Sequence, residues 1–292
     1  MELGNEVVVL DNFSSACDKF NCIRKNHMLK IVHGDVRNAR TVTAQVKKVD
    51  FVFHLAVEAL LASLVNPRIV HEVNVTGTLN VCLACKKNPP ERLVHVSSSE
   101  VYGTAQYVPM DENHPFCPTT PYGASKAASE VYVRSFYQTW KIPAVVVRPF
   151  NTYGPQCRTG QYSAVITKFF NRLVEGKPAI IHGDGKQTRD FTYVSDTVDG
   201  IIEAAKCDAL LGDSVNIARG EEVSIIRLAK IMTRLMGMKG DADPIFQRER
   251  LGDVRRHFAD ISKARKLLNF RPKISIEEGL KKFVEWERDA RR

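Results

Sequence analysis

The sequence lacks any uncharged apolar run of the roughly 18 residues that a membrane-spanning helix needs. It also lacks the basic and then apolar start of a secretory signal, so we expect a cytoplasmic protein with no membrane partner. Internal repeats and low-complexity linkers are absent as well. Apolar residues make up 44% of the 292 residues and charged residues 26%, a globular composition that excludes a disordered or fibrous chain.

Cysteine is scarce, with seven residues, and in a chain without a secretory signal these are expected to be reduced thiols. Cys82 and Cys85 have the spacing of a metal or redox pair. They lie in a stretch with helical periodicity, and no second ligand pair accompanies them. We therefore expect two small residues packed inside a helix, and no metal site.

Acidic residues are fewer than basic ones, 33 against 42, which gives a net charge of +9. The basic residues are scattered, and no Lys/Arg block alternates with aromatic residues as it would in a nucleic-acid-binding surface. No zinc or RNA-binding signature is present. We expect no nucleic-acid partner, and a small phosphorylated ligand suits this charge better.

The first half of the chain alternates short β-branched runs with amphipathic stretches. Near-continuous apolar runs are typical of parallel strands that are covered on both faces. The strand–helix alternation predicts an α/β fold with a Rossmann-like doubly wound parallel sheet. We expect strands at 6–10, 29–32, 51–55, 93–96 and 144–148, and helices at 67–87 and 119–140.

After Pro149 the elements become shorter and are separated by loops rich in glycine and proline. We expect a nucleotide-binding domain over 1–149, to which 195–220 returns, and a smaller α/β substrate-binding lobe that takes up most of 150–292. The expected helices are 163–175, 195–206, 224–236 and 276–288, and the expected strands are 179–181, 190–193 and 214–217.

Polar or small residues follow the predicted strands: Asp11 with Asn12, Asp35, Ala56 and the serines at 97–99. In doubly wound sheets, ligands bind at these carboxyl ends of the strands. Asp11 can accept hydrogen bonds from both hydroxyls of an adenosine ribose and would repel a 2′-phosphate. The pattern therefore favours NAD over NADP.

Tyr122 and Lys126 are four residues apart in a predicted helix, so they share one face. An ammonium group near the phenol would favour the phenolate form of Tyr122. Such a group can take the proton from a substrate hydroxyl while a hydride leaves to a nicotinamide. The pair follows the serine-rich strand end by about twenty residues, which makes the spacing more specific than Tyr-x-x-x-Lys alone.

Further motifs extend along the whole chain in a fixed order: Asp11-Asn-Phe-Ser-Ser, Gly34-Asp-Val-Arg, His54-Leu-Ala, Asn74-Val-Thr-Gly-Thr, Ser97-Ser-Ser-Glu-Val-Tyr-Gly, Pro121-Tyr-Gly-Ala-Ser-Lys, Arg148-Pro-Phe-Asn-Thr-Tyr-Gly-Pro, Gly183-Asp-Gly-Lys-Gln-Thr-Arg-Asp-Phe and Arg250-Leu-Gly-Asp. In this order they resemble the extended short-chain dehydrogenase/reductases, and specifically the nucleotide-sugar epimerase/dehydratase family.

This resemblance implies NAD as the cofactor, a nucleotide sugar as the substrate and a role for each matching residue. Tyr122 would be the base, Lys126 would hold the nicotinamide ribose and lower the pKa of Tyr122, and Ser98 would bond the C4 oxygen of the sugar. Asp11 and Asn12 would hold the adenosine ribose, Asp35 and Val36 would border the adenine, and Ala56 and Ser97 would complete the cofactor site. Asn151, Arg189, Arg250 and Asp253 would bind the substrate, with the two arginines on its pyrophosphate.

Glu100 bears on the choice between reactions that begin with oxidation at C4. A 4-epimerase needs no further base, whereas a 4,6-dehydratase must also remove the C5 proton, and by resemblance Glu100 matches the glutamate that does so. Ser99 replaces the aspartate that dTDP-glucose dehydratases use as an acid, and the segment from Arg250 to Asp253 looks more like the epimerases. We favour a 4,6-dehydratase. The alternatives are a UDP-glucose type 4-epimerase, a nucleotide-glucuronate decarboxylase, a ketosugar reductase and a non-catalytic nucleotide-sugar-binding fragment.

The family begins with a strand and a Gly-x-x-Gly-x-x-Gly turn that receives the NAD pyrophosphate, and this sequence contains neither. That first strand would lie between the strands that start near Glu6 and Phe51. We expect the natural protein to be longer, with the sequence starting at an internal methionine, rather than a naturally impaired chain. We also expect weak or absent NAD binding by the 292 residues, which a dissociation constant in the low micromolar range would contradict.

The helices expected at 67–87 and 119–140 carry wide apolar faces. By resemblance they would form the four-helix interface of a homodimer. Burial against the chain's own sheet would explain part of the same pattern.

Overall fold

The computed structural model describes residues 4–14, 27–157, 164–238, 243–249 and 253–291. Four parallel strands form the main sheet in the order β10-β5-β4-β3, and two further parallel strands, β1 and β2, form a separate sheet. This mixed architecture of parallel strands and covering helices confirms the predicted α/β, Rossmann-like fold class. The strands are β1 (Val7–Asp11), β2 (Leu29–His33), β3 (Phe51–His54), β4 (Arg92–Val96), β5 (Ala144–Pro149) and β10 (Ser214–Ile217).

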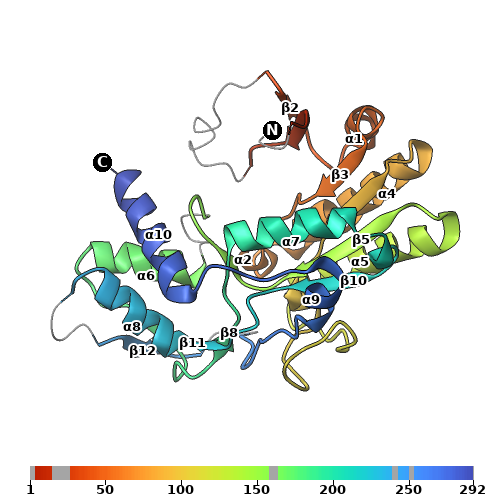
Figure 1. Ribbon diagram of the computed structural model, residues 1–292. Helices are drawn as coiled ribbons and strands as arrows, with labels where there is room; N and C mark the ends of the chain where they lie inside the picture. The colour runs from red at the N-terminus through yellow and green to blue at the C-terminus, as the bar shows by residue number, and fades with distance from the viewer. Residues whose placement is uncertain (1–3, 15–26, 158–163, 239–242, 250–252, 292) are drawn as a thin grey trace.

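Helices cover both faces of the main sheet (Figure 1). Successive side chains of a strand point to opposite faces, so Leu93 of β4 packs against one helical layer and Val94 against the other. Leu93 and Val94 of β4, the three valines of β5 and Val215 of β10 are buried, as expected for a doubly covered parallel sheet. The first layer contains α1 (Ala39–Val46), α4 (Gly77–Lys87) and α5 (Pro121–Trp140), and the second contains α7 (Val194–Lys206) and α9 (Ser262–Leu268).

The parallel strands are divided between β1 and β3, where the family's first strand would lie. Within the described ranges, β1 pairs only with β2, and β3 pairs only with β4. Leu10 of β1 and Val52 of β3 still pack against one hydrophobic core. On the opposite face of β3, Phe51 and Phe53 are 42% and 41% exposed. The division arises because no described strand lies between β1 and β3 to carry the backbone hydrogen bonds across.

The helix predicted over 67–87 is helical along almost its whole length, but it is not one regular α-helix. It begins as α3 (Pro67–His71), with Pro67 at the first turn and the Asn66 side chain accepting the N–H of Ile69. It then widens into a π-helical segment, η2 (Glu72–Thr76), and continues as α4. The short helix α2 (Leu60–Ser63) precedes it.

A separate hydrophobic core lies around Phe169, Phe170 and Phe283 and is formed by helices α6 (Val165–Val174), α8 (Ile225–Leu235) and α10 (Ile276–Asp289). These helices lie together to one side of the main sheet in Figure 1. The short strands pair as β12 (Ile245–Gln247) with β7 (Ile180–His182), β11 (Val223–Ser224) with β8 (Thr188–Arg189), and β6 (Thr152–Tyr153) with β9 (Thr192–Tyr193).

The strand predicted at 190–193 is interrupted. Asp190 and Phe191 separate β8 from β9. The buried Asp190 carboxylate accepts the backbone N–H groups of Arg219 and Gly220, so this part of the chain is held by a side chain rather than by a strand ladder. Propensity alone does not report such a contact.

Cys82 and Cys85 are packed inside α4, as predicted, and burial raises the pKa of both thiols to about 12. Among the described residues, no three metal-ligating side chains gather in one place. None of the described helices is both long and apolar enough to cross a bilayer.

Candidate active site

The start of α5 lies directly against the turn that follows β4. After β4 the chain enters the short 3₁₀ helix η3 (Ser99–Val101), and the Ser98 side chain accepts the N–H of Glu100 at 3.2 Å. Thr120 caps α5 by accepting the N–H of Gly123 at 3.1 Å. A Cβ atom at Gly123 would lie 2.6 Å from the Glu100 carbonyl oxygen. Glycine at this position therefore allows the helix that carries Tyr122 and Lys126 to approach the turn.

This approach brings Tyr122, Ser98 and Glu100 together. Burial raises the pKa of Tyr122 to about 12, a hydrogen bond with Ser98 lowers it, and the charge of Glu100 raises it. The sequence led us to expect that Lys126 would make this phenol acidic. Burial is the largest influence on this pKa, and the lowering by Lys126 remains a prediction.

Lys126 is buried, and its Nζ donates to the carbonyl oxygen of Val96, the last residue of β4, at 2.6 Å. Burial lowers the pKa of this ammonium group to about 8, and the nearby Glu130 raises it. Lys126 thus lies at the carboxyl end of the strand, where the fold places ligands.

Glu100 lies near two charged side chains from later in the chain, Arg189 and Asp253. Burial raises the pKa of Glu100, the positive charge of Arg189 lowers it, and Asp253 raises it. Arg189 forms an ion pair with Asp253 and donates to the Val254 carbonyl at 2.6 Å. The structure therefore unites the predicted residues Glu100, Arg189 and Asp253. Arg250 lies outside the described residues.

Two predicted ligand-binding side chains have buried polar atoms with no partner among the described residues. They are the Oγ of Ser97 and the Nδ2 of Asn151. Buried polar groups are normally hydrogen-bonded, so each such atom calls for an explanation. Both follow strands of the main sheet, β4 and β5, on the side where Lys126 lies. They fit a site that receives a polar ligand at this edge.

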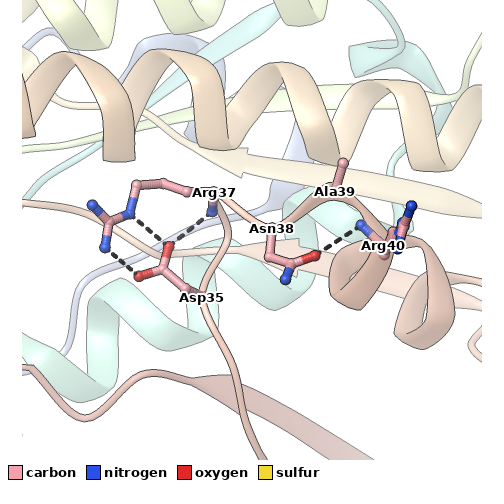
Figure 2. Close-up of a pocket in the computed structure, with 5 residues that line it drawn as sticks. All are labelled: Asp35, Arg37, Asn38, Ala39 and Arg40. Atoms are coloured by element: carbon pink, nitrogen blue, oxygen red, sulfur yellow. Dashed lines mark hydrogen bonds and ion pairs between the residues drawn. The ribbon is translucent and has the colours of Figure 1, made fainter.

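The residues predicted for adenosine form a separate group at the ends of β1 and β2. Asn12 donates to Asp35 at 2.8 Å, and the Asp11 carboxylate accepts the N–H of Phe13 at 2.7 Å. Arg37 makes two side-chain hydrogen bonds to Asp35 and holds the pKa of this carboxyl well below its usual range. Figure 2 shows this pair beside Asn38, at the start of α1. The adjoining hollow has a volume of about 680 Å³ and is lined by Asp35, Arg37, Asn38, Ala39 and Arg40.

The chain is similar to known nucleotide-sugar epimerases and dehydratases over most of its length. The family model described as GDP-mannose 4,6 dehydratase matches residues 1–283. The chain is 33% identical to a putative UDP-glucose 4-epimerase of Methanocaldococcus jannaschii, over 100% of this chain and 93% of that protein. It is 32% identical to human dTDP-D-glucose 4,6-dehydratase, over 95% of this chain and 80% of that protein.

The chain belongs to the NAD-dependent nucleotide-sugar epimerase/dehydratase family. Among solved structures, dTDP-glucose 4,6-dehydratase from Streptomyces venezuelae with NAD bound superposes with a TM-score of 0.90. That protein is 29% identical, and the match covers 98% of this chain and 88% of that one. Relatives with both types of activity are thus about equally similar to this chain.

Two further cofactor positions expected from the family lie in different surroundings. Val36 packs against the core beneath α1 and α4, and its carbonyl accepts the Asn80 side chain at 3.0 Å. Ala56 is half-buried in the loop after β3. The polar side chains at the ends of β1 and β4 fit the two ribose ends of NAD, and the described residues contain no Gly-x-x-Gly-x-x-Gly turn.

Several residues that support the site had no role predicted from the sequence. Arg148 is fully buried, forms an ion pair with Glu130 of α5 and donates to the hydroxyl of Tyr102 at 2.7 Å. His257 is also buried, and its Nε2 lies 3.1 Å from the carbonyl of Ser99. Arg148 stands in a quoted family motif, which was the available signal. Its partners are too distant in the sequence to be paired without a structure.

Proposed function

We propose that the chain oxidises C4 of a nucleotide-linked hexose and then removes water across C5 and C6, as a 4,6-dehydratase. The observation that carries the proposal is the placement of Glu100, in the turn after β4, beside Tyr122 at the start of α5. A buried carboxyl next to a tyrosine and a lysine is a common signature of acid–base chemistry. NAD, when bound, would supply the hydride acceptor for C4.

Tyr122 would take the proton of the C4 hydroxyl. Ser98, which already bonds Tyr122, would orient the C4 oxygen towards the phenol. Lys126 would hold the nicotinamide ribose, and its positive charge would favour loss of the Tyr122 proton once a ligand draws it away from the Val96 carbonyl. Because burial raises the pKa of Tyr122 to about 12, a positive charge of this kind is needed for the phenolate to form near neutral pH.

Glu100 would act after C4 has become a ketone. A neighbouring carbonyl makes the C5 proton acidic, and Glu100 would take it while the C6–O bond breaks, so that this proton leaves with the C6 hydroxyl as water. The hydride and the proton removed at C4 would then return to C6 and C5, which gives the 4-keto-6-deoxy sugar. Burial raises the pKa of Glu100, which makes its carboxylate a stronger base than an exposed one. Arg189, held by Asp253, would donate charge-assisted hydrogen bonds to the substrate's phosphates. Asn151 would contact the nucleotide sugar through its unpartnered Nδ2.

A 4-epimerase is the second candidate. Position 99 is a serine, so it offers no carboxylic acid to protonate the leaving C6 hydroxyl. Ser99 is buried, and its backbone carbonyl lies 3.1 Å from the Nε2 of His257. Epimerases also stand among the similar proteins. An epimerase would use Tyr122, Lys126 and Ser98 in the same way, and Glu100 would have no chemical role.

The test is product analysis by NMR with excess NAD and a panel of UDP-, GDP- and dTDP-hexoses. A 4-keto-6-deoxy product, with its new methyl signal, is expected from the unmodified chain. Glu100→Gln should abolish this methyl signal while the fold is retained. A mixture of C4 epimers that is unaffected by Glu100→Gln would reject dehydration in favour of epimerisation. No turnover with any substrate would contradict both candidates.

We also propose a homodimer formed through α4 and α5. Leu83 of α4 is 47% exposed, and Val131 of α5 is 58% exposed, although both belong to helices that pack on the sheet. Tyr132 adds a further exposed apolar ring beside Val131. Exposed apolar side chains that gather on one surface mark protein interfaces. Light scattering coupled to size exclusion should give twice the mass of the chain, and a stable monomer would contradict the interface.

A further inference from the structure

One segment of the chain, residues 253–260, contacts both Arg189 and the turn that carries Glu100. At the start of this segment, Asp253 forms an ion pair with Arg189. The carbonyl of Val254 accepts a side-chain N–H of the same arginine at 2.6 Å. The segment therefore supports the guanidinium group of Arg189 through a side chain and through its own backbone.

Backbone hydrogen bonds anchor the rest of the segment. The carbonyl of Arg255 accepts the N–H of Thr188 at 3.0 Å. Further along, the carbonyl of Phe258 accepts the N–H of Met110 at 2.7 Å, and the N–H of Asp260 donates to the carbonyl of Met110 at 2.9 Å. A side chain in the middle of the segment is thus attached to a backbone that is held on both sides of it.

His257 is the side chain that joins this segment to the turn. It is fully buried, and its Nε2 lies 3.1 Å from the carbonyl oxygen of Ser99. Because a carbonyl oxygen can only accept, Nε2 must carry the hydrogen in this contact. The same oxygen accepts the N–H of Tyr102 at 3.1 Å, which is the hydrogen bond that closes η3. The imidazole therefore adds a second hydrogen bond to an oxygen that holds the turn together.

The charge state of His257 suits this contact. Burial and the positive charge of Arg189 lower the pKa of the imidazole to about 3, so the ring is neutral near pH 7. A neutral imidazole has one N–H group, and here that group donates to Ser99. The Nδ1 atom is buried and has no hydrogen-bond partner among the described residues, and the ring of Phe150 lies 5.0 Å away between centroids. The one donor of His257 is thus committed to the turn.

We propose that His257 is a positioning residue that fixes the turn at 98–100 relative to the segment that supports Arg189. This inference rests on the proposed roles of Glu100 in proton removal and of Arg189 in binding the phosphates. A nucleotide sugar would contact Arg189 with its phosphates and Glu100 with its hexose, so the spacing of these two side chains has to match the substrate. A displacement of about 1 Å at a reacting group can cost about 100-fold in rate.

The first test compares three variants in steady-state assays. His257→Leu keeps an apolar side chain in the buried position but cannot donate to the Ser99 carbonyl, and it should lower kcat about 10-fold or more while KM for the nucleotide sugar changes by less than about 3-fold. His257→Gln places an amide N–H near the position of Nε2 and should recover most of kcat. Arg255→Gln, the control in the same segment, removes an exposed ion pair with Asp184 and leaves the backbone in place, so kcat and KM should not change.

A second measurement needs neither turnover nor cofactor. Hydrogen–deuterium exchange of the backbone amides at 101–103, which donate the hydrogen bonds of the turn, reports how firmly the turn is held. His257→Leu should speed this exchange about 3- to 10-fold, the effect of losing one hydrogen bond. The amides of β5 should keep their protection, which would show that the fold as a whole is intact. His257→Gln and Arg255→Gln should leave the exchange at 101–103 unchanged.

The two measurements separate this proposal from the proposed reaction. Equal exchange at 101–103 in His257→Leu and Arg255→Gln would overturn the positioning role, and so would a kcat of His257→Leu equal to that of the unmodified chain. Faster exchange at 101–103 in His257→Leu, in a protein that converts no nucleotide sugar, would support the positioning role and reject the proposed reaction instead.

Discussion

The two ends of the candidate site are built in different ways. Around Tyr122, the side chains of Ser97, Ser98 and Lys126 are buried, Tyr122 and Glu100 are half-buried, and Arg189 of β8 lies close to Glu100. Around Asp11 and Asp35, a two-stranded sheet stands apart from the main sheet, and its side chains are only partly buried. Chemistry that needs precise geometry is thus placed where packing is dense, and the adenosine end depends on a few polar contacts such as Asn12 with Asp35.

The largest effect is expected at the chemical end. Tyr122→Phe removes the hydroxyl that would take the C4 proton, and general acid–base groups typically contribute about 10²- to 10⁴-fold to the rate. We expect kcat to fall by that factor in steady-state assays with the active nucleotide sugar. Tyr137→Phe, on the same helix, is the control and should retain the full rate. A Tyr122→Phe variant with a normal kcat would show that the dense end of the site does not perform the chemistry.

A large loss of stability is expected from the buried ion pair below this end. Arg148 and Glu130 are both fully buried, and removing one partner of such a pair leaves an uncompensated charge that costs about 3–5 kcal/mol. Glu130→Gln should lower the free energy of unfolding in urea by about this amount. Glu203→Gln breaks an exposed pair with Lys206 and should cause no measurable change. Equal costs would remove the contrast between buried and exposed charges.

Much of the densely packed region could be predicted from the sequence. Apolar runs gave the strands through β5, because a doubly covered sheet leaves few polar positions. The spacing of Tyr122 and Lys126, with the serines before them, indicated one site, and the structure places Ser98 and Glu100 beside Tyr122. The effect of Lys126 on the Tyr122 pKa stays a prediction, since sequence spacing does not report how strongly burial acts on a phenol.

The sequence could not predict the hydrogen bonds between residues that are far apart in the chain. Asn74, in the π-helical segment η2, makes side-chain hydrogen bonds to Glu58 and Ser125, and hydrophobic periodicity does not distinguish such a segment from an α-helix. The division between β1 and β3, by contrast, agrees with the missing first strand that the sequence indicates. Helix α9 was missed because its seven residues are too few for a clear period.

An intermediate loss of stability is expected when the pH is lowered, because the buried histidines favour the neutral form. Burial lowers the pKa of His54 and of His257 to about 3, so both are neutral in the folded state, while the unfolded chain takes up protons below about pH 6.5. Stability should be fully present above pH 6.5 and decline as the pH falls towards 3, by at most about 1.4 kcal/mol per pH unit for each histidine.

Denaturant unfolding at several pH values measures this slope. His54→Gln keeps a side-chain amide that can bond the Thr78 hydroxyl, which lies 2.9 Å from His54 Nε2. It should reduce the dependence on pH between 6.5 and 3, whereas substitution of the exposed His71 should not. If His54→Gln leaves the pH dependence of stability unchanged, the imidazole of His54 takes up its proton in the folded chain as readily as in the unfolded chain. Water would then reach this part of the interior.

The smallest effect is expected at the uncovered face of β3. Phe53 is 41% exposed, and since full burial of such a side chain is worth about 1.5–3 kcal/mol, Phe53→Ala should cost about 1–2 kcal/mol. Phe136 of α5 is buried in the core on the opposite face, and the same substitution there should cost about 3–5 kcal/mol. Chemical denaturation of the two variants compares the faces directly. A loss at Phe53 as large as that at Phe136 would mean that this face is covered in solution, and the contrast between the two ends of the site would then concern hydrogen bonding alone.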